Sequence, residues 1–168
     1  RDMADMLQAV LEQEGVRVLT GMSLTEVREE NGVKVAVAKD KNGQEHVLRA
    51  ASMLLALGRK PNVDTLALEN TGVEHSPKGI PVDARMRTNQ QHIHALGDVT
   101  GAHQFTHAAG YEGGIVLSNA IIHFPRKADY TWMPRATYTE PELAAMGKTE
   151  KELRQEGTDY TVWTEHFS

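Results

Sequence analysis

Hydrophobic residues recur along this chain with two different periods. Over residues 2–14 the apolar positions fall three or four residues apart, as on one face of an α-helix, and Gly15 follows as a natural stop. These positions are Met3, Met6, Leu7, Val10 and Leu11. The spacing predicts an amphipathic helix at the start of the chain.

Between residues 24 and 57 the period changes to two, so apolar and polar positions alternate. The dipeptides Asn31-Gly32 and Asn42-Gly43 lie where tight turns favour a positive φ. The pattern predicts an antiparallel β-meander. Its last strand, residues 52–57, is apolar throughout, which predicts burial on both faces.

Other short segments add to this outline. A helix is expected over residues 106–122, although each of its three glycines costs about 1 kcal/mol relative to alanine. Such glycines indicate close approach by another backbone or by a ligand. Residues 149–152 read Thr-Glu-Lys-Glu, which predicts a capping box before a further helix. Further strands are expected at 16–21, 92–96 and 160–167.

Composition excludes several classes of function. The chain of 168 residues has a formal net charge of −5 and no long run of Lys and Arg, so nucleic acid is not an expected partner. Its longest apolar run, residues 53–57, is far below the roughly 18–20 residues of a membrane helix, and residues 1–10 do not resemble a signal peptide. A soluble, cytoplasmic protein is therefore expected.

The absence of cysteine from these residues removes another group of chemistries. It excludes a disulfide framework, thiolate zinc sites and a cysteine nucleophile within these 168 residues.

One short stretch, HIHALGDVTG at residues 92–101, carries candidate chemistry. Asp98 follows Gly97 at the end of an apolar strand, where a carboxylate can accept hydrogen bonds from a polyol in the crevice of an α/β sheet. Gly97 has no side chain and so permits close approach to the backbone. The alternative is a solvated turn aspartate.

Three motifs occur in order: LLALGRKPN (54–62), MRTNQQHIHALGDVTG (86–101) and YTEPELAAMGKTEKEL (138–153). In this order they resemble the FAD-dependent pyridine nucleotide–disulfide oxidoreductases, a family that includes dihydrolipoamide dehydrogenase, mercuric reductase and glutathione reductase. The resemblance covers nearly the whole chain. Residues 104–114 are most similar to the mercuric reductase and dihydrolipoamide dehydrogenase branches.

The resemblance implies an α/β fold with some α+β character, made of incomplete slices of two Rossmann-like nucleotide-binding domains. Residues 1–57, including the meander, would be the C-terminal half of the NAD(P)-binding domain. Residues 58–125 would be the C-terminal part of the FAD-binding domain, and 126–168 the start of an α+β dimerisation domain. The chain would then be a middle fragment of a longer protein that forms a homodimer.

The resemblance also implies roles for individual residues. Asp98, beside Gly97, would bind the ribityl chain of FAD, and the amides around Thr106, His107 and Ala108 would face the flavin's pyrimidine edge. Arg59 would lie at a domain crossing near the cofactor, the alternative being a solvated loop. The helix after residue 106 also has an alternative reading, as a packing helix.

The family passes electrons from NADH or NADPH through FAD to a disulfide or another small-molecule acceptor. The family's cysteine pair, its Gly-x-Gly-x-x-Gly loops and its C-terminal histidine–glutamate pair have no match here, so no residue is assigned a catalytic role. The chain alone is expected to be inactive.

Two other functions stay open at this stage. One is a non-catalytic interaction or regulatory domain derived from the family. The other is a metal-binding protein, because two pairs of histidines have close spacing, although no acidic residue joins them in a helical metal motif. These histidines are His92, His94, His103 and His107.

Overall fold

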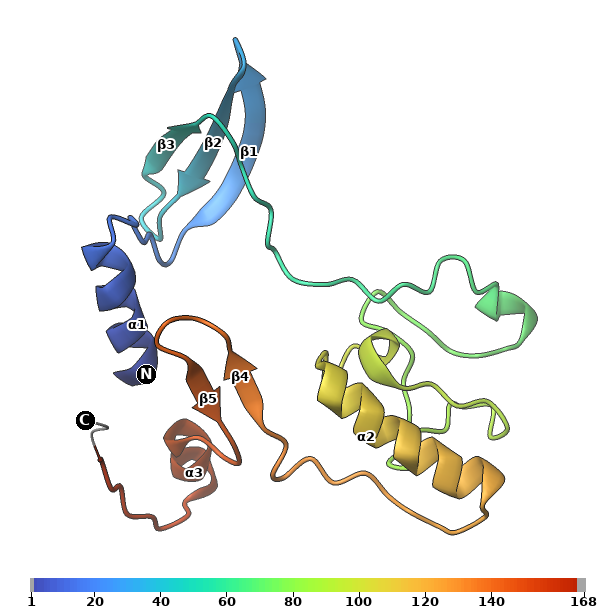
Figure 1. Cartoon of the computed structure of the whole chain (residues 1–168). Coiled ribbons are helices and arrows are strands. Elements are labelled where there is room, and N and C mark those ends of the chain that lie inside the picture. Colours follow the sequence, from blue (N-terminus) through green and yellow to red (C-terminus); the bar gives the residue numbers. More distant parts are fainter. Residues whose placement is uncertain (1, 166–168) are drawn as a thin grey trace. The chain divides into compact units, whose positions relative to one another are not determined.

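The structure is a computed structural model that describes residues 2–165. The chain divides into two compact units, Arg1–Gly58 and Arg59–Ser168. Helices are mixed with two small antiparallel sheets, one in each unit (Figure 1). The mixed α/β content expected from the sequence is therefore confirmed, whereas no two strands pair in parallel within residues 2–165. None of the helices in this range is long and apolar enough to cross a membrane.

The first unit opens with helix α1, Asp2–Gln13, which confirms the predicted amphipathic helix. Gly15 adopts a φ of 89°, and the amide of Val16 donates to the carbonyl of Leu11, so the chain turns out of the helix at this glycine. The strand predicted at 16–21 is wrong. A strand needs a neighbour for its backbone hydrogen bonds, and no described strand pairs with this segment.

The predicted meander is confirmed in its first three strands, β1 (Ser23–Glu30), β2 (Val33–Lys39) and β3 (Glu45–Ala50). They pair antiparallel in the order β1-β2-β3. Asn31 and Gly32 both have positive φ, 51° and 81°, as a type I′ turn requires. The central strand carries the buried residues of this unit, from Val35 to Ala38.

The fourth predicted strand of the meander, residues 52–57, is wrong. The segment is not paired with another strand, and its leucines are exposed: Leu54 by 88%, Leu55 by 64% and Leu57 by 82%. Apolar composition predicted burial, but burial needs flanking strands, and none of the strands in residues 2–165 pairs with it.

The second unit begins with turns around a small core. Short 3₁₀ helices lie at η1 (Leu68–Asn70) and η2 (Gly97–Thr100). The strand predicted at 92–96 is wrong, since only an isolated bridge joins Arg87 and His94. The buried core of these turns consists of Val63, Leu68, Val73, Ile80 and Ala95.

The predicted helix 106–122 is confirmed as α2, Thr106–Val116, continued by the π-helical turn η3, Leu117–Ile121. Ala108, Glu112 and Ile115 are its buried residues. A Cβ atom added to any of its three glycines would meet nothing within 4 Å. Within residues 2–165, therefore, no other segment makes the close approach that these glycines indicated.

The last part of the unit contains β4 (Arg135–Thr137) paired antiparallel with β5 (Leu143–Ala145), followed by α3 (Glu150–Glu156). The predicted capping box is confirmed: the Thr149 hydroxyl accepts from the Glu152 amide, and the Glu152 carboxylate accepts from the Thr149 amide. The predicted strand 160–167 is wrong over residues 160–165, and its last residues lie outside the described range.

Candidate functional site

The turn that carries Asp98 is held by two glycines. Gly97 is buried with a φ of 71°, and Gly101 has a φ of 74°. A Cβ atom on Gly97 would lie 3.1 Å from the Cβ of Ala109, and one on Gly101 would lie 1.7 Å from the carbonyl oxygen of Lys78. The backbone contact at Gly101 admits only glycine, and the positive φ of Gly97 with its close neighbour Ala109 favours glycine there too, so the turn is packed between α2 and the segment before Ile80.

This turn presents Asp98 to solvent beside Arg59. The Arg59 Nη1 atom donates to the Asp98 carboxylate at 2.7 Å and lies 3.4 Å from the carbonyl oxygen of Gln104. The Asp98 side chain is 48% exposed and the Arg59 side chain is 64% exposed, so the ion pair contributes at most about 1 kcal/mol to stability. The pair is informative through its position, because it brings together at one turn two residues that are 39 positions apart in the sequence.

The N-terminus of α2 lies next to this pair. Phe105 is the N-cap residue and provides no side-chain cap, and its carbonyl accepts from the amide of Ala109, which closes the first turn of the helix. The amides of Thr106, His107 and Ala108 precede it, at the positive end of the helix dipole. Ala108 is fully buried.

A cavity of about 220 Å³ lies between Arg59, the start of α2 and residues 136–138. Arg59, Thr106 and His107 all contribute to its wall. The His107 ring is already engaged, since its Nε2 atom lies 2.8 Å from the carbonyl oxygen of Pro134, which accepts the hydrogen bond. His107 is therefore available to a ligand through its backbone amide rather than its ring. The remaining lining residues are Gln104, Phe105, Ala136 and Tyr138.

Glu112 is a functional candidate that sequence reasoning missed. It is 1% exposed, in the middle of α2, and its two carboxylate oxygens accept hydrogen bonds from the Gly97 amide at 2.5 Å and the Tyr130 hydroxyl at 2.7 Å. Burial, and then the hydrogen bond to Glu112, raises the pKa of Tyr130 well above its usual value, so the phenol stays a donor. The only sequence signal was a glutamate inside an otherwise apolar, glycine-rich helix.

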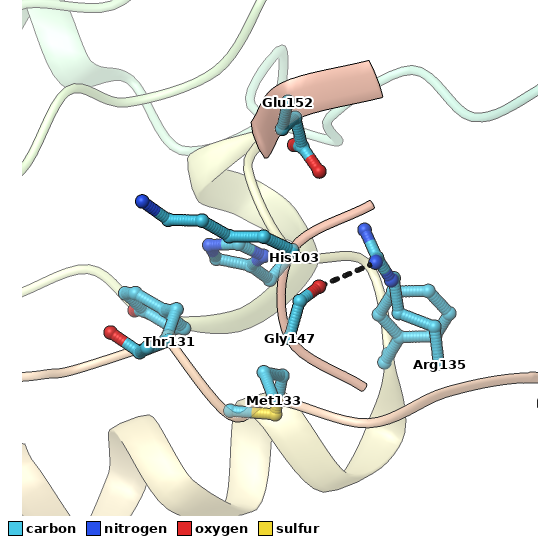
Figure 2. A pocket seen from close by; sticks show the side chains of 9 residues that line it. His103, Thr131, Met133, Arg135, Gly147 and Glu152 are labelled. Carbon is cyan, nitrogen blue, oxygen red and sulfur yellow. Dashed lines mark hydrogen bonds between the residues drawn. The ribbon is translucent and has the colours of Figure 1, made fainter. Parts of the chain in front are cut away.

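A second cavity, of about 240 Å³, lies between the loop before α2 and the β4–α3 region (Figure 2). Its charged residues are already used within the fold. Arg135 donates to the carbonyl of Gly147 at 3.0 Å, the dashed line in Figure 2. Hydrogen bonds from the Thr149 amide and hydroxyl lower the pKa of Glu152. His103 stacks on Tyr130 with ring centroids 3.9 Å apart, so this cavity is chiefly a packing gap.

The four histidines of the metal hypothesis do not converge. His92 and His94 line a third cavity with Arg85, Arg87 and His123, while His103 and His107 make the contacts described above. Within residues 2–165 no three His, Cys, Asp or Glu side chains are placed to hold a metal ion. The geometry gives the metal hypothesis no support.

Comparison with known proteins identifies the family. The model of the pyridine nucleotide-disulphide oxidoreductase family matches residues 1–113. The chain belongs to this family. The resemblance read from the three motifs is thereby confirmed.

Curated relatives come from the two branches that the α2 region indicated. A mercuric reductase from Staphylococcus aureus is 38% identical over 94% of this chain and 29% of its own length. A dihydrolipoyl dehydrogenase from Bacillus subtilis is 42% identical over 99% of this chain and 36% of its own length. The chain therefore spans about a third of the length of these relatives.

Solved structures agree. The HOCl-induced flavoprotein disulfide reductase RclA from Escherichia coli matches with a TM-score of 0.81 and 27% identity, over 95% of this chain and 36% of that protein. LpdA from Mycobacterium tuberculosis has a TM-score of 0.80 at 23% identity, which is a likeness of fold. The chain has the fold of one part of a flavoprotein disulfide reductase.

Proposed function

We propose that this chain is part of a flavoprotein oxidoreductase that passes electrons from NADH or NADPH through FAD to a disulfide or another small-molecule acceptor. One observation carries the proposal: Asp98, Arg59 and the uncapped N-terminus of α2 lie together in the second unit, with Arg59 and the start of α2 sharing one cavity. Family membership gives this cluster its chemical meaning.

The donors and acceptors of the cluster fit part of an FAD molecule. The half-exposed Asp98 carboxylate can accept hydrogen bonds from the hydroxyls of a ribityl chain. Gly97 leaves no side chain between such a chain and the backbone. The amides at Thr106 and His107, which line the cavity, supply the donors that a carbonyl-bearing pyrimidine edge requires. The expected contribution of the Ala108 amide is not part of this proposal, because Ala108 is fully buried and does not line the cavity.

When bound, FAD supplies the ability to accept a hydride and pass on its electrons. The role of the protein residues is to bind and orient this cofactor. Asp98, held by Arg59 on one side, fixes the polyol. The α2 amides and the helix dipole favour negative charge at the helix N-terminus, where it accumulates when flavin is reduced. No thiol step is assigned to this chain, which contains no cysteine.

The other parts of the chain have proposed roles as well. Residues 1–57 would belong to the NAD(P)-binding domain, 58–125 to the FAD-binding domain and 126–168 to a dimerisation domain of a homodimer. Family membership and the partial coverage of the relatives support this division. Alone, the 168 residues are proposed to be inactive.

The test is an FAD titration of the complete protein that contains this chain, stripped of flavin and monitored by flavin fluorescence. Asp98→Ala is compared with Asp64→Ala, a matched control because Asp64 is also an exposed aspartate in an ion pair of 2.7 Å, with Lys60. Loss of the charge-assisted hydrogen bonds from the ribityl hydroxyls, each worth roughly 10- to 100-fold in affinity, predicts FAD binding at least about 10-fold weaker for Asp98→Ala and no change for the control.

Equal FAD affinity in both variants would refute the placement of the ribityl chain at Asp98. A complete protein that takes up no FAD would instead favour the alternative function, a non-catalytic domain that keeps the family fold.

A further inference from the structure

Glu112 occupies an unusual position for a carboxylate. It is 1% exposed, and a buried charge is costly unless each oxygen is hydrogen-bonded. Both oxygens meet this requirement, through the Gly97 amide at 2.5 Å and the Tyr130 hydroxyl at 2.7 Å. The flavin chemistry proposed above does not use this group.

The amide that Glu112 holds belongs to the residue directly before Asp98. Gly97 has a φ of 71°, so its amide points away from a regular ladder and needs a separate acceptor. Its carbonyl accepts from the Thr100 hydroxyl at 2.9 Å. Both backbone polar groups of Gly97 are thus hydrogen-bonded, and the partner of its amide is Glu112 on α2.

Glu112 therefore ties together the two halves of the candidate flavin site. It lies on α2, the helix whose first amides are those of Thr106 to Ala108, and it accepts a hydrogen bond from the turn that presents Asp98. The regular rise of about 1.5 Å per residue fixes the position of Glu112 relative to these amides along the helix. The side chain of Glu112 thus sets how far the Asp98 turn lies from the α2 amides.

Tyr130 fixes the second oxygen and so the orientation of the carboxylate. Its ring stacks on His103 with centroids 3.9 Å apart and meets Tyr111 edge-on at 6.0 Å. The Tyr111 hydroxyl in turn accepts from the amide of Asp129 at 2.8 Å. The hydroxyl of Tyr130 is held in place by these contacts, and the carboxylate cannot rotate without breaking one of its two bonds.

We propose that Glu112 is a positioning residue for flavin, which acts through the Gly97 amide to hold Asp98 at the right distance from the start of α2. This inference rests on the proposed function. It predicts that Glu112 alters flavin binding without touching the flavin, and that Tyr130 acts on the same path.

The experiment uses the complete protein with variants Glu112→Gln, Tyr130→Phe and Asp98→Ala, and with Glu74→Gln as control, since Glu74 is an exposed glutamate in the same unit. Glutamine keeps the size of the side chain and one acceptor oxygen but loses the charge. Loss of one charge-assisted bond predicts roughly 10- to 100-fold weaker FAD binding for Glu112→Gln.

Two further readouts separate positioning from mere stability. Hydrogen exchange at the Gly97 amide of the flavin-free protein is expected to accelerate in Glu112→Gln and not in the control. In a double-mutant cycle, Glu112→Gln is expected to weaken FAD binding no further once Asp98 is alanine, because both changes act on one contact. Tyr130→Phe removes no group from the Gly97 bond and is expected to give a smaller effect in the same direction.

The outcomes are distinguishable. Unchanged FAD affinity and unchanged Gly97 exchange in Glu112→Gln would overturn the inference and leave the proposed function standing. Fully additive losses in the cycle would also overturn it, since a destabilised fold acts independently of Asp98. If Asp98→Ala itself leaves FAD binding intact, it is the placement of the flavin that fails. Should Glu112→Gln not fold, Tyr130→Phe carries the same test.

Discussion

Replacement of Gly101 by alanine probes the turn on which the proposed flavin site depends. A Cβ atom at this position would lie 1.7 Å from the carbonyl oxygen of Lys78 and 2.9 Å from its carbonyl carbon. Both atoms are backbone, so no side-chain rotation can relieve the contact, and the turn must move away from its neighbour. The left-handed φ of 74° adds conformational strain for any residue with a Cβ atom.

The magnitude follows from these two costs. A left-handed conformation costs an L-residue about 1–2 kcal/mol. Overpacking against a fixed neighbour typically adds about 1–3 kcal/mol. Gly101→Ala is therefore expected to lower the free energy of unfolding by about 2–5 kcal/mol.

Gly157→Ala is the matched control. Gly157 lies in the same unit with a φ of 68°, but a Cβ atom there would meet nothing within 4 Å. Its replacement should cost only the conformational strain, about 1–2 kcal/mol. Urea unfolding of the two variants, followed by circular dichroism, measures the difference. Equal destabilisation by both substitutions would refute the close packing of the turn against Lys78.

Two smaller predictions concern acid stability and helix capping. Burial alone would raise the pKa of Asp83, but bonds from the Arg87 guanidinium and from the amides of Arg87 and Arg85 outweigh it and lower that pKa. The stability that Asp83 contributes is therefore present above its ordinary pKa of 3.8 and is lost as the pH falls through the lower pKa of the folded state. Asp83→Asn should make the free energy of unfolding depend less on pH in this acid range. An unchanged pH dependence would contradict the assignment. Thr149→Ala removes the capping box of α3 and should cost about 1 kcal/mol, seen as faster amide exchange over Glu150–Glu156, whereas unaltered exchange would show that the cap does not hold the helix.

Elements whose stabilising contacts are local could be predicted from the sequence. Helix α1 follows from its apolar spacing and Gly15, the first three strands of the meander from alternation and the Asn31-Gly32 turn, and the α3 cap from Thr149 and Glu152. In each of these cases the residues that decide the structure lie within a few positions of one another.

Elements that depend on distant partners could not be predicted from the sequence. Residues 16–21 and 52–57 have the composition of strands, but no strand within residues 2–165 pairs with them, so they form no strand and are largely exposed. A strand is defined by its neighbour, and composition cannot say whether a neighbour is present.

The candidate site divides in the same way. Asp98 and its glycines were visible as a motif, and the structure brings Asp98 to Arg59 across 39 residues. Glu112 was not visible, because its partners Gly97 and Tyr130 lie 15 and 18 residues away and give no periodic signal. A buried charge is recognised from its surroundings, which sequence pattern alone does not specify.

The most direct test of the central claim is the visible absorption spectrum of the complete protein as purified, before and after release of any bound cofactor. The account predicts flavin bands, identified as FAD on release, that persist in Asp64→Ala and are lost from Asp98→Ala. A colourless protein that takes up no added FAD, or a variant without Asp98 that retains its full flavin content, would contradict it.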